Sequence, residues 1–205
     1  MRRYVVGVTG ASGSLCARSL LCALAGHAEV ERVHLALSQF SIQTLNVELG
    51  ARIKDEAEAL TALLGEARGE GSLRGKITLH RTGDMAASIS SGSYPTDGMV
   101  VVPCSGGTLA AIANGTSANL LHRAAEVTLK ERRPLVLAFR ESPLSLVHAE
   151  NIVRATRAGA VVFPLTPAFY SAPRGIQEIV EQLTARILDL LHLPHSLGTR
   201  WGTDR

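Results

Sequence analysis

Groups suited to binding an anion occur at three places along this chain. They are GVTGASG at 7–13, the serine-rich segment 88–93 and SGGT at 105–108. Glycines let the backbone approach a ligand, hydroxyls donate hydrogen bonds, and the N–H groups at a helix N-terminus favour negative charge. Candidate cations are Arg123, Lys130, Arg140 and Arg186. The combination predicts binding of two phosphorylated ligands or of one dinucleotide.

Each of these features also has a plainer interpretation. The turn at 7–13 can be a tight strand-to-helix connection without a ligand, and residues 84–93 can be a flexible connector. Arg123 and Lys130 are seven residues apart and share a helix face, which can simply be solvated. Cys104, a small residue at a strand end, is more often a packing residue than a nucleophile.

Several other chemistries lack their sequence signature. The seven histidines are dispersed, and Pro194 separates His192 from His195, so no metal site is predicted. The chain has no G-x-S-x-G nucleophile elbow and no G-x-x-x-x-G-K phosphate loop. Ser38, rather than an acidic residue, follows the second predicted strand, and no Tyr-x-x-x-Lys pair occurs. Both observations argue against an NAD-dependent dehydrogenase.

The elements that must position these groups alternate along the chain. Short apolar runs predict strands at 4–8, 33–37, 77–80, 99–102, 135–139 and 160–163. Helical periodicity predicts helices at 15–24, 42–49, 55–64, 108–113, 120–131, 145–158 and 176–191. The charged, glycine-rich segment 65–75 is predicted to be a surface loop. Alternating strands and helices predict a mostly parallel sheet with helices on both faces, whose ligands bind at the carboxyl edge.

Composition sets the broad class of the protein. The 205 residues are 46% apolar and 19% charged, which suits one α/β domain, predicted at 1–191, followed by a tail at 192–205 that contributes to the site or to an oligomer. No run of eighteen apolar residues occurs, so we expect no membrane association, and the net charge of +3 predicts no nucleic-acid partner. Three cysteines without metal-type spacing predict reduced thiols and a cytoplasmic location.

Over nearly its whole length the sequence resembles the UbiX-type flavin prenyltransferases. The motifs that carry the resemblance are VTGASG at 8–13, ISSGS at 89–93, GMVVVPCS at 98–105, RAAEVTLKERRPLVLAFRESPLS at 123–145, HAEN at 148–151 and PAFY at 167–170. The resemblance implies a flavodoxin-like or Rossmann-like three-layer α/β/α fold and a homo-dodecamer or other high-order oligomer. It also implies a metal-independent transfer of a dimethylallyl group from dimethylallyl phosphate to N5 and C6 of reduced FMN. The product, prenylated FMN, would serve a UbiD-type decarboxylase.

The resemblance also implies which residues bind and react. FMN would contact Gly10, Ala11, Ser12, Ser38, Ser105, Gly106, Gly107, Thr108 and Arg140. Dimethylallyl phosphate would contact Ser91, Gly92, Arg123, Lys130, Arg140, Tyr170, Arg186 and Trp201. The groups implied in catalysis are Ser12, Glu48, Lys130 and Glu141, through proton handling and stabilisation of the departing phosphate. Met85 stands where the family often has a tryptophan beside the prenyl group.

Two alternatives stay open beside this interpretation. One is a flavin-dependent cysteine decarboxylase, which shares the flavin fold and uses a catalytic histidine. The other is an FMN-binding accessory or carrier subunit of a decarboxylase. The basic block Lys130-Glu131-Arg132-Arg133 and the Arg140-Glu141 pair favour a phosphorylated substrate.

Overall fold

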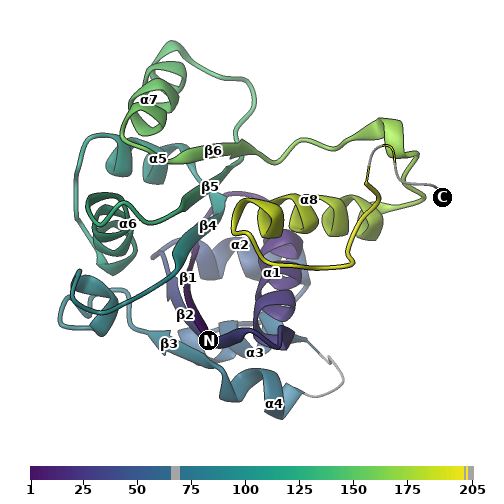
Figure 1. The fold of residues 1–205 in the computed structure, drawn as a ribbon, viewed down its shortest axis with the longest axis horizontal. Helices are drawn as coiled ribbons and strands as arrows, with labels where there is room; N and C mark the ends of the chain where they lie inside the picture. The colour runs from purple at the N-terminus through teal and green to yellow at the C-terminus, as the bar shows by residue number, and fades with distance from the viewer. Residues whose placement is uncertain (66–69, 201, 203–205) are drawn as a thin grey trace.

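The structure, a computed structural model, describes residues 1–65, 70–200 and 202 of the chain. Within these residues one sheet of six parallel strands has the order β3-β2-β1-β4-β5-β6. The strands are β1 (Arg2–Val8), β2 (Val30–Leu37), β3 (Ile77–His80), β4 (Gly98–Cys104), β5 (Leu135–Phe139) and β6 (Val161–Pro164). The sheet forms the middle layer of the molecule (Figure 1).

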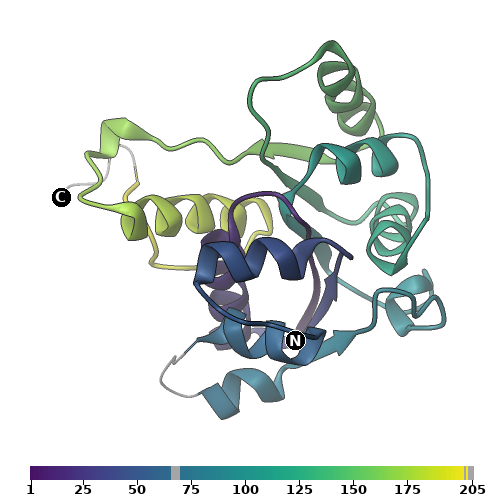
Figure 2. The ribbon, with the colours of Figure 1, turned by 180° about the vertical axis from the view of Figure 1, so that it is seen from behind.

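Helices cover both faces of this sheet. One face carries α1 (Ser14–Gly26), α2 (Ser41–Leu49), α3 (Glu56–Leu64), α4 (Glu70–Gly75) and α8 (Ile176–Leu190). The other carries η1 (Ser88–Ser90), α5 (Gly106–Ala113), α6 (Leu120–Lys130) and α7 (Leu146–Arg157). The two sets of helices lie on opposite sides of the sheet in Figures 1 and 2. The expected three-layer α/β/α fold is therefore confirmed.

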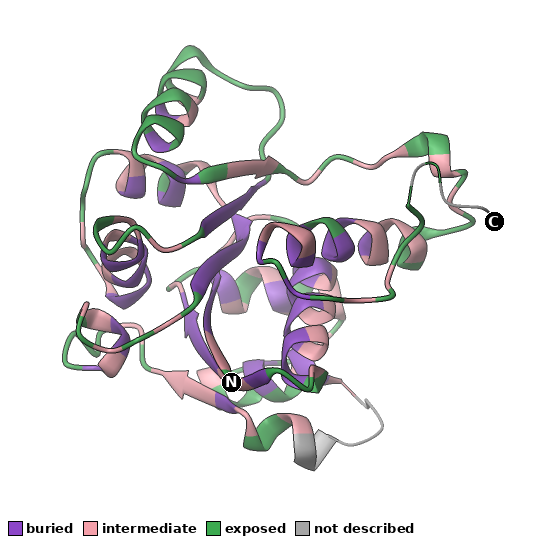
Figure 3. Cartoon of the chain, viewed as in Figure 1, coloured by how far each residue is buried: buried purple, intermediate pink, exposed green. Residues whose placement is uncertain are grey.

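The central strands are buried on both sides because each face carries helices. Every residue of β4 and β5 is buried, and Val100 and Val101, which point to opposite faces, belong to the two separate apolar clusters. At the edge, β6 is exposed or half-buried. Burial falls outward from the centre of the sheet, as the colours of Figure 3 show.

One predicted segment differs from the structure. The stretch 65–75 was expected to be a surface loop, but Glu70–Gly75 forms the short helix α4. Leu73 packs against the core and lies 3.8 Å from where a Cβ of Gly26 would be. This long-range apolar contact with α1 favours a helical turn that local glycine and charge content would not predict.

An arm leaves the body after β6. Residues 165–175 run outward through η2 (Phe169–Ser171), α8 returns to the sheet, and the chain after Leu193 runs back along α8 (Figures 1 and 2). Phe169 and Ile176 on this arm are 73% and 68% exposed. In the described part of the chain, no helix is long and apolar enough to cross a membrane.

Candidate functional site

The order of the strands creates a crevice between β1 and β4. The helix after β1 packs on one face and the helix after β4 on the other, so the loops diverge at the carboxyl ends of these strands. Thr9, at 2% exposure, connects the two strand ends. Its hydroxyl donates to the Pro103 carbonyl at 2.7 Å and accepts from the Ser105 N–H at 3.0 Å.

Glu48 of α2 fixes the turn that follows β1. Its carboxylate accepts from the N–H of Gly13 at 3.1 Å and from that of Ser14 at 2.7 Å. Burial alone would raise the pKa of Glu48, but hydrogen bonds from Ser12, Ser14 and Gly13 outweigh it and lower this pKa overall. Glu48 is therefore an ionised carboxylate at the N-terminus of α1. Its negative charge interacts favourably with the positive end of the helix dipole.

Two further contacts set the shape of this turn. A Cβ added at Gly10 would lie 2.8 Å from the Phe40 Cβ and 3.0 Å from its carbonyl oxygen, so the two loops touch at that point. Thr44 donates its hydroxyl to the Gly10 carbonyl at 2.9 Å. The N–H of Ser38 donates to the Val8 carbonyl at 2.8 Å, which places Ser38 beside the turn.

The N-terminus of α5 provides backbone donors at the same edge. The Ser105 hydroxyl caps the helix by accepting from the Thr108 N–H at 3.3 Å and donates to the Thr108 hydroxyl at 3.1 Å. The N–H groups of Gly106 and Gly107 have no acceptor among the described residues. An added Cβ at Gly107 would meet nothing within 4 Å, so the surface at this residue is open.

Arg140, Glu141 and His148 complete this edge. Arg140 is exposed, and its N–H donates to the Cys104 carbonyl at 3.1 Å, beside the start of α5. A Cβ added at Gly106 would lie 2.9 Å from His148 Nε2 and 3.4 Å from Glu141 Oε2. His148 was not among the predicted site residues, although it lies in the HAEN motif at 148–151; its Nδ1 accepts from the Ser145 N–H at 3.2 Å.

These residues suit the phosphate of the expected flavin mononucleotide. The edge combines two N–H donors without acceptors among the described residues, the Ser105 hydroxyl, and the residues Ser38 and Arg140, whose backbones lie beside β1 and β4. A phosphate needs hydrogen-bond donors and positive charge within reach of several oxygens. The structure thus brings the predicted FMN residues to one edge, together with Glu48 and Glu141.

A second group of predicted residues gathers at α6. Arg123 donates through Nε to the Ser90 carbonyl at 3.1 Å and pairs with Glu126 at 3.2 Å. Lys130 pairs with Glu131, and a Cβ added at Gly92 would lie 2.6 Å from Lys130 Nζ and would collide with the Glu131 carboxylate. Arg123 and Lys130 therefore flank the loop that carries Ser91 and Gly92.

Two further sets of contacts hold this loop: hydrogen bonds from Arg133, and a contact between Tyr94 and His34. Arg133 donates to the carbonyls of Gly92 at 2.8 Å and Tyr94 at 2.9 Å. The Tyr94 hydroxyl lies 3.0 Å from Nε2 of His34, whose Nδ1 lies 2.9 Å from Nε2 of His80. Segment 84–93 is thus fixed at its C-terminal end, unlike a free connector.

A third group lies on the arm. Tyr170 of η2 and Arg186 of α8 line a pocket of about 480 Å³ where the arm meets α8. Asp189 of α8 and the C-terminal residues His195 and Arg200 also form part of its wall. Trp201, also expected there, lies outside the described residues. Met85 is 46% exposed in the loop between β3 and η1.

Within one chain these three groups do not converge. The N–H of Leu120 bonds to Thr82, just after β3, so α6 starts at the carboxyl edge and ends with Lys130 toward the opposite edge. The arm projects from the side of the molecule away from α6 in both views (Figures 1 and 2). The FMN edge, the α6 group and the arm pocket are therefore separate in a single protomer.

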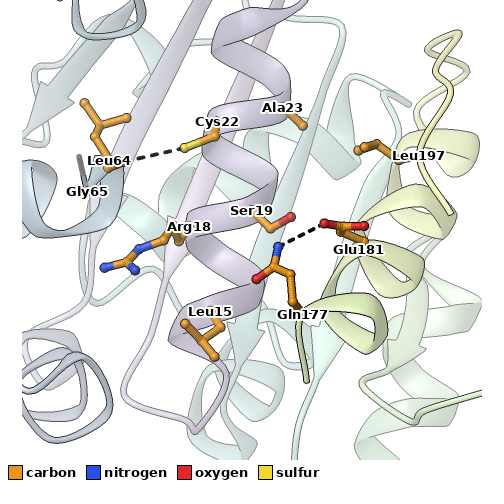
Figure 4. Close-up of a pocket in the computed structure, with 10 residues that line it drawn as sticks. All are labelled: Leu15, Arg18, Ser19, Cys22, Ala23, Leu64, Gly65, Gln177, Glu181 and Leu197. Atoms are coloured by element: carbon orange, nitrogen blue, oxygen red, sulfur yellow. Dashed lines mark hydrogen bonds between the residues drawn. The ribbon is translucent and has the colours of Figure 1, made fainter. Parts of the chain in front are cut away.

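A second pocket contains none of the predicted residues. It has a volume of about 440 Å³ and lies between α1 and α8, beside the end of α3 (Figure 4). Its wall includes Leu15, Arg18 and Cys22, and the Cys22 thiol points to the Leu64 carbonyl at 3.8 Å. This pocket lies in the helical layer formed by α1, α3 and α8. The Gly106 and Gly107 donors belong to α5, on the opposite face of the sheet.

The cysteines act as packing residues. Cys104 is fully buried, and burial raises the pKa of its thiol far above the usual range. Burial, with Glu48 adding to it, raises the pKa of Cys16 to about 11. Cys16, Cys22 and Cys104 are all free thiols in the structure. The described residues contain no group of three or more metal-ligating side chains.

Comparison with known proteins shows the family and the fold. Residues 1–188 match the model of the Flavoprotein family. The chain is 41% identical over 204 residues to the flavin prenyltransferase LpdB of Lactiplantibacillus plantarum, with all of both chains covered.

Two solved structures resemble the whole fold. The crystal structure of AnUbiX in complex with FMN and dimethylallyl pyrophosphate has a TM-score of 0.83 and 40% identity, covering 100% of this chain and 99% of that one. A dodecameric FMN-dependent UbiX-like decarboxylase from Escherichia coli O157:H7 has a TM-score of 0.83 and 38% identity, covering 98% and 100%.

Proposed function

The chain belongs to the UbiX-type flavin prenyltransferase family, and from this premise we propose that it transfers a dimethylallyl group from dimethylallyl phosphate to reduced FMN. The observation that carries the proposal is the donor set at the carboxyl edge. The N–H groups of Gly106 and Gly107 have no acceptor among the described residues, and the Arg140 backbone lies at the same edge, at the crevice where α/β sheets bind ligands. Reduced FMN supplies the nucleophilic N5 and C6 atoms.

The residues at this edge divide into binding and proton-handling groups. Gly10, Ala11, Ser12, Ser38, Ser105, Gly106, Gly107, Thr108 and Arg140 bind FMN. Glu141 lies 3.4 Å from the Cβ position of Gly106 and handles a proton at its carboxylate. Ser12 assists proton transfer, and Glu48 holds the turn that presents Ser12.

The prenyl donor is bound by groups from neighbouring copies of the chain. Ser91, Gly92, Arg123 and Lys130 lie at α6, whereas Tyr170 and Arg186 lie on the arm, so assembly is needed to bring them to one FMN. Exposed apolar side chains on the arm and on α7, including Phe169, Ile176 and Leu146, support a homo-oligomer, in our proposal a dodecamer. The guanidinium and ammonium groups stabilise the phosphate as it leaves.

The proposed function includes an enzyme that receives the product and a cellular location for the reaction. Prenylated FMN would be passed to a UbiD-type decarboxylase, because a modified flavin is useful only to an enzyme that binds it. Three free thiols support a reducing location such as the cytoplasm.

An anaerobic incubation tests the proposal. The protein is mixed with FMN, dithionite and dimethylallyl phosphate, and the extracted flavin is weighed by mass spectrometry. A flavin heavier by one five-carbon prenyl unit is expected. Unmodified FMN with both the phosphate and the diphosphate donor would refute the transferase; persistent FMN binding would then favour a carrier, and loss of carbon dioxide from a cysteine peptide would favour the decarboxylase.

A further inference from the structure

Asp189 is the centre of an ion-pair cluster that joins α8 to the C-terminal segment. Its Oδ2 accepts from Nη1 of Arg186 at 2.9 Å. Its Oδ1 accepts from Nη2 of Arg200 at 2.9 Å and lies 3.0 Å from Nε2 of His195. One carboxylate therefore holds two guanidinium groups that are fourteen positions apart in the chain.

The cluster opens into the arm pocket. Arg186, Asp189, His195 and Arg200 all line this cavity, together with Tyr170. Its described lining residues include two guanidinium groups and one carboxylate, so the pocket offers N–H donors to an anion. Asp189 remains charged, because burial, which raises its pKa, is outweighed by hydrogen bonds from Arg200 and His195 that lower it.

We propose that Arg200 binds the phosphoryl group of the prenyl donor together with Arg186, and that Asp189 is the positioning residue that orients both guanidinium groups. The ligand class is an allylic monophosphate or diphosphate. This inference rests on the proposed function, which places Tyr170 and Arg186 at the donor, and it adds a cation and an orienting carboxylate that no motif predicted.

The geometry of guanidinium groups supports this assignment. Each carries five N–H donors in a planar fork, so it can bind a carboxylate oxygen and a phosphoryl oxygen at once. Asp189 accepts from Nη1 of Arg186 and from Nη2 of Arg200 through different oxygens, which fixes the spacing of the two cations. A fixed pair of cations matches a group that gains negative charge as it leaves.

The C-terminal segment is also seated closely enough to position Arg200. A Cβ added at Gly198, whose φ is +70°, would lie 3.0 Å from the Ala185 Cβ on α8. Leu193 is 2% exposed and belongs to the core cluster on the α8 face. The segment therefore packs along α8 as irregular chain and places Arg200 beside Arg186.

Steady-state prenylation of reduced FMN by Arg200→Ala, Arg200→Lys and Asp189→Asn tests the inference. We expect Arg200→Ala to raise the KM for dimethylallyl phosphate about tenfold with kcat within about twofold, and to raise the Ki of inorganic pyrophosphate by the same factor. Arg200→Lys should recover part of the loss because charge is kept. Asp189→Asn should raise KM about threefold. FMN affinity, measured by flavin fluorescence, should not change.

Two control variants separate donor binding from seating of the segment. Arg174→Ala removes an exposed arginine on the same arm that pairs with Glu178 at 2.6 Å, and it should leave KM and Ki unchanged. Gly198→Ala disturbs the segment but keeps every charge. If Arg200→Ala leaves Ki for pyrophosphate unaltered, or if Gly198→Ala and Arg200→Lys both reproduce its full effect, the inference is wrong.

Failure of the proposed function gives a different result. If the wild-type protein forms no prenylated flavin, the same variants are titrated with dimethylallyl phosphate in the presence of oxidised FMN by calorimetry. Weaker binding by Arg200→Ala, with Arg174→Ala equal to the wild type, would uphold the anion site without the transferase. Equal binding by all variants would overturn the site as well.

Discussion

Protonation of His34 should destabilise the fold in acid. His34 on β2 is 3% exposed and contacts His80 and Tyr94 through its two ring nitrogens. Burial is the main cause that lowers its pKa from 6.5 to about 4, and the charges of His80, Arg32 and Arg3 add to it. The imidazole therefore stays neutral at neutral pH and holds the loop that carries Ser91 and Gly92.

The size of the effect follows from the two protonation equilibria. His34 in the unfolded chain takes up a proton as pH falls through 6.5, whereas in the folded chain it does so only near pH 4. The free energy of unfolding therefore decreases as pH is lowered from 6.5 to about 4. At pH 5 the difference amounts to about 2 kcal/mol of the free energy of unfolding, and it approaches about 3.4 kcal/mol below pH 4.

Urea unfolding followed by circular dichroism at pH 8 and pH 5 measures this loss. His34→Gln removes the titrating group, so its free energy of unfolding should change by about 2 kcal/mol less than that of the wild type between these pH values. His192→Gln, at an exposed histidine, is the matched control and should follow the wild type. Subunit concentration is held constant, because association shifts apparent stability. Identical pH dependence in His34→Gln and the wild type would refute the reasoning.

Three further predictions concern the FMN edge. Glu48→Gln should lower the free energy of unfolding by about 2 kcal/mol and weaken FMN binding, because an ionised acceptor of the Gly13 and Ser14 N–H groups is lost; Glu58→Gln, at an exposed carboxylate that accepts from Lys54, should cost less than half as much in urea unfolding. Gly10→Ala should destabilise the chain by about 1–3 kcal/mol and reduce FMN affinity, because its Cβ would meet the Phe40 backbone; Gly83→Ala, where nothing lies within 4 Å, should behave as the wild type. Cys104→Ala should keep prenyl transfer within about twofold, and a loss of about a hundredfold would show that the buried thiol takes part in the reaction.

The regular elements were largely predictable because local pattern and burial agree. The runs at 99–102 and 135–139 lie at the centre of the sheet, where apolar residues face helices on both sides. Boundaries were less predictable, because long-range hydrogen bonds extend the strands. β1 begins at Arg2, whose N–H donates to the Glu29 carbonyl, and β4 continues to Cys104, past the Pro103 carbonyl that Thr9 binds.

The candidate site could be predicted only in part. The glycine and hydroxyl turns predict anion binding at the carboxyl edge, since carboxyl ends of parallel strands meet there, and this assignment stays a prediction. Glu48 came from the family resemblance, because a carboxylate 35 positions after Gly13 has no local signal of its contact. The contacts of His148 with the start of α5, and of Arg200 with Asp189, have no local signal for the same reason: they form only when separate segments pack together.

The hydroxyl of Thr9 couples the two loops of the FMN edge. One oxygen both donates to the end of β4 and accepts from the residue that begins the next loop, so the turn after β1 and the loop before α5 cannot open separately. The conformational entropy of ordering them is lost once, during folding, rather than at each encounter with a ligand. A change in the conformation of either loop will therefore act on the other through the Thr9 hydroxyl.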